Sequence, residues 1–136
     1  SITTVLIVPD TRLDTQFARD LLPEVVPHAD AAANSACAGL LVHAIGNDPS
    51  LLFEATVDRL HQEYRRSAMP ESLARVDTLR DAGLAAVVSG AGPTVAVLGT
   101  EVDLLARCEE VLTGDESRMI AASIADSGVV VTSTPS

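Results

Sequence analysis

A short polar stretch around residue 65 carries the side chain that is best suited to binding an anion. Arg65 presents a rigid guanidinium fork, and this shape matches a carboxylate or a phosphate group. The residue follows His61 and Tyr64 and is itself followed by Arg66. The residues alone leave two interpretations open, an anion-binding arginine and a pair of solvated charges on a loop.

A glycine-rich loop is the second feature that could serve chemistry. Two apolar, β-prone runs flank it, and Gly90 and Gly92 can adopt backbone angles that are closed to other residues. The loop is not a Walker or Rossmann nucleotide loop, because the lysine of the first and the third glycine of the second are missing. An ordinary hairpin turn is the alternative interpretation. The loop consists of Ser89, Gly90, Ala91, Gly92, Pro93 and Thr94.

The histidines and cysteines lack the spacing of a metal site or of a nucleophilic triad, so we predict no metal ligands and assign no catalytic residue. His61 lies three residues after Asp58, which favours a hydrogen-bonded structural pair. Cys37 and Cys108 lie far apart in helical patterns, where cysteine usually acts as a small buried hydrophobe. We therefore expect free thiols.

Five segments, taken in order, resemble the C-terminal half of homoserine kinases, which belong to the GHMP superfamily of small-molecule kinases. The resemblance runs roughly from Thr3 to Leu98, and the actinobacterial branch is the most similar. One such segment alone would be a weak signal, whereas five in the right order are specific. The segments are residues 15–23, 28–34, 58–65, 69–72 and 89–94.

The resemblance implies a role in substrate binding for several of these residues. Arg65 stands where the family has an arginine that binds the carboxylate of the substrate amino acid, and His28 and Asn34 stand near the substrate pocket. The family carries a second carboxylate-binding arginine three residues after that asparagine, but this chain has Cys37 there. Losing one charged hydrogen bond costs about 1.5–3 kcal/mol. We therefore expect weak substrate binding, a different ligand or lost kinase activity, with Cys37→Arg as the substitution that restores the cation.

The N-terminal half of GHMP kinases holds the phosphates of ATP in a phosphate loop, and no segment of this chain resembles that loop. We therefore expect one domain over residues 1–136 without the ATP-binding half, and ATP and Mg²⁺ only in a complete kinase. The resemblance implies ATP-dependent phosphorylation of the homoserine hydroxyl in threonine biosynthesis, with the glycine loop on the nucleotide side. The partners would be a small amino-acid substrate and an N-terminal half. The alternative is a stand-alone, non-catalytic module that binds a ligand or forms a homodimer.

The order of the predicted elements indicates how these residues are positioned. Hydrophobic periodicity and turn residues predict strands at 3–8, 84–88, 96–98 and 129–132, and helices at 15–21, 30–45, 48–61, 70–82, 101–112 and 115–125. The helices between residues 15 and 60 form an insertion after the first strand. The remaining order of strand, helix, strand, strand, helix, strand is that of a ferredoxin-like split βαβ fold, an α+β sandwich.

Composition limits the function classes further. Of the 136 residues, 47% are hydrophobic but only 2% are aromatic, so the core must consist of Ala, Val, Leu and Ile. The net charge of −10, without a cluster of basic residues, argues against nucleic-acid binding. No apolar run approaches the ~20 residues of a membrane span, and no signal peptide is evident. We therefore expect a cytoplasmic protein with no membrane partner.

Overall fold

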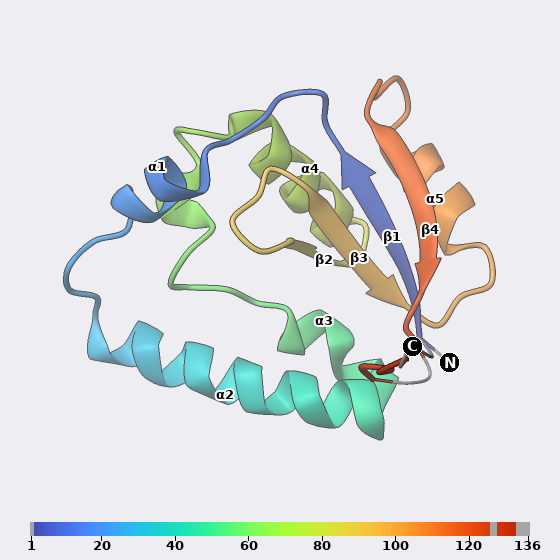
Figure 1. Cartoon of the computed structure of the whole chain (residues 1–136), viewed down its shortest axis with the longest axis horizontal. Helices are drawn as coiled ribbons and strands as arrows, with labels where there is room; N and C mark the ends of the chain where they lie inside the picture. Colours follow the sequence, from blue (N-terminus) through green and yellow to red (C-terminus); the bar gives the residue numbers. More distant parts are fainter. Residues whose placement is uncertain (1, 126–127, 133–136) are drawn as a thin grey trace, which may run out of the picture.

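The computed structural model describes residues 2–125 and 128–132 and places four strands of this part in one antiparallel sheet (Figure 1). The sheet order is β2-β3-β1-β4, and every neighbouring pair is antiparallel. This is the order of a ferredoxin-like split βαβ fold, so the predicted α+β class is confirmed. The strands are β1 (Thr3–Val8), β2 (Ala85–Val88), β3 (Val95–Gly99) and β4 (Arg118–Ser123).

Two helices, α4 (Pro70–Asp81) and α5 (Leu104–Val111), cover one face of this sheet. The core between them is aliphatic, as the composition predicts. Cys108 belongs to this core, and burial raises the pKa of its thiol to about 11, so the group is neutral and packs as a small hydrophobe. The buried core residues are Val5, Ile7, Val76, Leu79, Leu84, Ala86, Val95, Val97, Leu104 and Cys108.

The predicted insertion between β1 and α4 consists of α1 (Thr15–Asp20), α2 (His28–Gly46) and the short α3 (Leu52–Ala55). Two 3-10 turns, Pro49–Leu51 and Glu63–Arg65, lie on either side of α3. Figure 1 shows α2 away from the sheet, with α3 between its C-terminal part and the strands. The N-terminal part of α2 contacts the loop after α3, where the side chain of Asn34 accepts the backbone N–H of Arg59.

The fourth strand lies where the sequence predicted a helix. Residues 115–125 contain Met and Ala, which favour helices, but residues 118–123 pair along β1 instead, with Leu6 opposite Ile120. Pairing along a free sheet edge outweighs a weak local preference. The strand predicted at 129–132 is wrong, because these residues have no regular structure and Val129 and Val131 are exposed.

The helix predicted over residues 48–61 is also shorter than expected, because α3 ends at Ala55. The side chain of Arg80 stabilises this end of α3. It donates to the carbonyl of Phe53 at 2.8 Å and to the hydroxyl of Thr56 at 3.0 Å, and it lies over the Phe53 ring. The residues after Thr56 are thereby free to run back across the domain as a loop.

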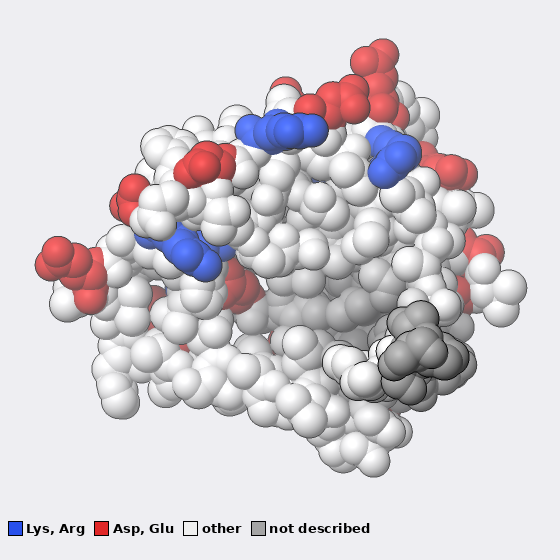
Figure 2. Space-filling model, viewed as in Figure 1, with Lys and Arg blue, Asp and Glu red and all other residues white. Residues whose placement is uncertain are grey.

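No helix in the described part of the chain is both long and apolar enough to cross a membrane. In the view of Figure 2, the surface over α2 is almost free of charged atoms, whereas acidic and basic side chains both lie along the opposite edge.

Candidate functional site

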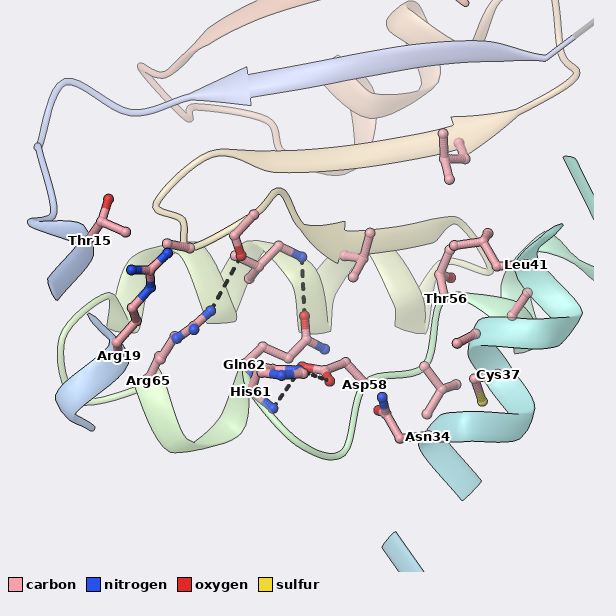
Figure 3. Close-up of a pocket in the computed structure, with 18 residues that line it drawn as sticks. Thr15, Arg19, Asn34, Cys37, Leu41, Thr56, Asp58, His61, Gln62 and Arg65 are labelled. Carbon is pink, nitrogen blue, oxygen red and sulfur yellow. Dashed lines mark hydrogen bonds and ion pairs between the residues drawn. The ribbon is translucent and has the colours of Figure 1, made fainter. Parts of the chain in front are cut away.

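A pocket of about 570 Å³ lies between the insertion and the sheet, and Figure 3 shows it in close-up. Helix α2 forms one wall, and β2, β3 and the loop that follows α3 form the other. At one end lie the residues of α1 and of the Glu63–Arg65 turn, together with the start of the glycine loop. Its lining includes Arg19, Asn34, Cys37, Leu41, Asp58, His61, Gln62, Arg65, Gly90 and Ala91.

Arg65 is only 7% exposed, and its guanidinium connects two other parts of the pocket. Nε donates to the carbonyl of Ala18 in α1 at 3.0 Å, and Nη1 donates to the carbonyl of Gly90 at 3.3 Å. Among the described residues, Nη2 has no hydrogen-bond partner. The side chain therefore lies at the pocket in a fixed orientation and keeps donor capacity for an anion.

Arg19 is a second cation at the same end of the pocket, and it is not among the site residues predicted from the sequence. The residue lies in the last turn of α1, and Figure 3 shows its guanidinium near that of Arg65. No ion pair of Arg19 is found among residues 2–125 and 128–132. Its sequence signal was its place in the segment 15–23, one of the five that carry the resemblance.

Asp58 and His61 form the expected hydrogen-bonded pair, with 2.9 Å between Oδ1 and Nδ1, but on a loop and not on a helix. Asp58 also accepts from the backbone N–H groups of Leu60, His61 and Gln62. Burial raises the pKa of Asp58, but the N–H of Gln62, the imidazole and the N–H of Leu60 together bring it below its ordinary value. The carboxylate thus stabilises the turn that leads to Arg65.

The glycine loop reaches the pocket only through its first half, Gly90 and Ala91. The second half is held against α4: the hydroxyl of Ser72 donates to the carbonyl of Pro93 at 2.6 Å, and the Gly92–Pro93 peptide is cis. Pro93 and Thr94 line a separate hollow beside the β1–α1 loop. The loop closes on itself through a bond from the Ser89 N–H to the carbonyl of Thr94.

The three α2 residues named from the sequence occupy different places. Asn34 and Cys37 line the pocket, at a distance along its wall from the arginines (Figure 3). Asn34 accepts the backbone N–H of Arg59 at 2.9 Å, and the thiol of Cys37 lies 3.6 Å from the carbonyl of Glu54. His28 is the first residue of α2, is exposed and is not part of the pocket lining.

The part of the chain that the structure describes contains no group of three His, Cys, Asp or Glu side chains able to hold a metal ion. The pocket combines two arginines at one end with largely apolar walls. This arrangement can bind and orient a small carboxylate, whereas it offers no set of ligands for a cation.

Comparison with known proteins identifies the family of the chain. Residues 31–112 match the family GHMP kinases C terminal. The homoserine kinase of Streptomyces avermitilis is 57% identical over 101 residues, which cover 74% of this chain and 33% of that protein. The homoserine kinase of Rhodococcus erythropolis is 45% identical over 130 residues, which cover 96% of this chain and 41% of that protein.

The fold is shared with a solved structure as well. The crystal structure of homoserine kinase from Cytophaga hutchinsonii superposes with a TM-score of 0.73 at 22% identity, over 89% of this chain and 40% of that chain. The matched residues span 33% and 41% of the length of these two curated relatives. It belongs to the GHMP kinases, as a C-terminal domain of the kind found in actinobacterial homoserine kinases.

Proposed function

We propose that this domain supplies the substrate-carboxylate site of a homoserine kinase. The observation that carries the proposal is the position of Arg65 and Arg19 at one end of one pocket, where their guanidinium groups lie near each other. Charged hydrogen bonds from two such groups hold a carboxylate strongly and fix its orientation. The substrate class comes from the relatives, which are homoserine kinases.

In the complete enzyme, the domain binds homoserine by its carboxylate and orients the hydroxyl for phosphorylation by ATP. The family implies ATP and Mg²⁺, but the described residues do not fit a magnesium site. No chemical step is therefore assigned to these groups on this domain. Its contribution is to bind and position the substrate, with the glycine loop toward the nucleotide side.

Reconstitution tests the proposal. Coexpression of this chain with the N-terminal half of an actinobacterial homoserine kinase should give ATP-dependent phosphorylation of homoserine, and Arg65→Ala in that complex should abolish it. The chain alone should neither phosphorylate homoserine nor bind Mg-ATP with micromolar affinity in calorimetry. A folded complex that is inactive with homoserine and related hydroxy amino acids would contradict the kinase assignment.

The alternative function is a non-catalytic ligand-binding or dimerisation module. The observation in its favour is the apolar surface of α2, on which Val42 is 75% and Ile45 43% exposed. Sedimentation at high protein concentration distinguishes the two functions in part. A clean monomer argues against dimerisation through this surface.

A further inference from the structure

The pocket is larger than homoserine requires. Its volume of about 570 Å³ lies within the range of roughly 300–1,000 Å³ that holds drug-sized molecules, whereas homoserine is a four-carbon amino acid. With a carboxylate between Arg19 and Arg65, most of the hollow toward α2 remains unfilled. The character of that remaining part decides what else the pocket can bind.

The end of the pocket opposite the arginines is apolar. Figure 3 shows Cys37 and Leu41 there, on the face of α2 that looks toward the strands. Residues from α3, from the loop that follows it and from β3 complete this end. The apolar lining consists of Cys37, Ala38, Leu41, Ala55, Val57 and Leu98.

Thr56 and Cys37 supply polar groups at this end that are already bound within the protein. The hydroxyl of Thr56 donates to the carbonyl of Leu52 at 2.8 Å and accepts from Arg80 at 3.0 Å, and Thr56 is 4% exposed. The thiol of Cys37 is directed at the carbonyl of Glu54. A polar ligand group placed here would lose its hydration without gaining a partner, which disfavours polar tails and favours aliphatic ones.

In the middle of the pocket, the carboxylate of the lining is not free to bind a ligand. The carboxylate of Asp58 accepts from three backbone N–H groups and from the imidazole of His61. The side-chain carbonyl of Gln62 accepts the N–H of Val88 at 3.1 Å. The charges that the lining leaves for a ligand are therefore those of the two arginines, at one end only.

Residue 37 contributes directly to this polarity. The resemblance to homoserine kinases implies an arginine at this position, and the chain has a cysteine there instead. The α2 end of the pocket thus lacks the cation that this resemblance implies.

We propose that the α2 end of the pocket is an aliphatic subsite, so that the domain binds carboxylates with an aliphatic tail, of hexanoate to octanoate length. The carboxylate lies at Arg19 and Arg65, and the tail extends along α2 toward Leu41. The inference rests on the proposed function for its carboxylate anchor alone. In the complete kinase, such a molecule competes with homoserine.

A chain-length series tests the subsite on this chain as it exists. Acetate, butanoate, hexanoate and octanoate are titrated in turn, and binding is followed by NMR shifts of backbone amides and arginine side chains. Affinity should rise with each methylene by up to about fourfold, the value for complete burial. Alkylammonium ions of the same lengths are the matched control, and they should not bind because the arginines repel them.

Each outcome has a distinct meaning. Binding of short carboxylates with no gain from butanoate to octanoate overturns the subsite and leaves the proposed carboxylate site intact. Absence of any response at Arg19 and Arg65 to every carboxylate overturns the anchor and with it the proposed function. Equal binding of alkylammonium ions overturns the inference, because it shows apolar association without the anchor.

Two variants locate the tail. Leu41→Asn should reduce octanoate affinity by about fivefold to tenfold and leave acetate affinity unchanged, since only the tail reaches residue 41. Val42→Asn, on the exposed side of the same helix, is the matched control and should change neither affinity. If both variants weaken octanoate equally, the tail does not lie in the pocket.

Discussion

The Nε of Arg65 lies 3.0 Å from the carbonyl oxygen of Ala18, and both residues are buried. The bond joins the turn that carries Arg65 to the helix that carries Arg19. The same guanidinium reaches the glycine loop through the carbonyl of Gly90. The residue proposed to bind the substrate therefore also connects the three segments that form its end of the pocket.

Arg65→Ala should weaken both the fold and carboxylate binding. The substitution leaves the carbonyls of Ala18 and Gly90 without their donor, which costs about 1–3 kcal/mol of unfolding free energy. Arg66→Ala is the control, because Arg66 pairs with Glu63 and Asp77 at the surface, where such a pair contributes at most about 1 kcal/mol. Urea denaturation measures the unfolding free energy of both variants, and equal decreases would contradict a structural role for Arg65.

Arg19→Gln should separate binding from stability. Arg19 is exposed, so the unfolding free energy should change by no more than about 0.5 kcal/mol. Homoserine or acetate affinity should fall roughly tenfold or more, because one charged hydrogen bond contributes about 1.5–3 kcal/mol. The control is Arg118→Gln, an exposed arginine outside this pocket. Unchanged affinity in the Arg19 variant, measured by NMR titration, would remove Arg19 from the site.

Gly92→Ala should destabilise the domain more than Gly90→Ala does. Both glycines have positive φ, 87° and 61°, so an alanine at either position has a strained backbone conformation. At Gly92 a Cβ would also lie 2.5 Å from the sulfur of Met69 and 3.2 Å from Val88, whereas at Gly90 nothing lies within 4 Å. We expect an additional loss of about 1–3 kcal/mol at Gly92 from this contact. Thermal melts measure the midpoints of the two variants, and equal midpoints would contradict the predicted additional loss at Gly92.

The parts of the fold that the sequence predicted are those where local signals and packing agree. The strand predicted from Thr3 coincides with β1, and the helix predicted to begin at Pro70 coincides with α4. The helix predicted at 15–21 coincides with α1, whose first turn is capped by the side chain of Asp14. The glycine loop connects two strands, as its flanking apolar runs indicate.

The parts of the structure that the sequence did not predict depend on contacts between residues far apart in the chain. β4 is a strand because β1 offers a free edge, which the Met- and Ala-containing sequence of residues 118–123 does not reveal. Arg19 enters the pocket because Arg65, 46 positions later in the chain, binds the neighbouring carbonyl of Ala18. A single sequence without the fold does not specify which of its charged residues converge.

Acid should weaken the turn between residues 58 and 62. The folded pKa of Asp58 lies below its unfolded value of 3.8, so the ionised carboxylate stabilises the fold above about pH 4, and this contribution is lost as pH falls through the folded pKa. Asp58→Asn should lower the unfolding free energy by about 1.5–3 kcal/mol at pH 6. The difference between the two proteins should shrink as pH is lowered from about 4 to about 2. Denaturation curves over this range test it, and a constant difference would show that the charge of Asp58 is not involved.

Cys37→Arg distinguishes two assignments of the α2 end of the pocket. If position 37 belongs to the carboxylate site, as the resemblance implies, the new cation should tighten homoserine binding roughly tenfold to a hundredfold. If Arg19 and Arg65 already provide that site, homoserine affinity should stay within about twofold, while octanoate affinity should fall because a charge enters the aliphatic subsite. We expect the second result, since Figure 3 places Cys37 at the opposite end from both arginines. Cys37→Ser serves as the control for loss of the thiol alone, and thermal melts of both variants establish that affinities are compared between folded proteins.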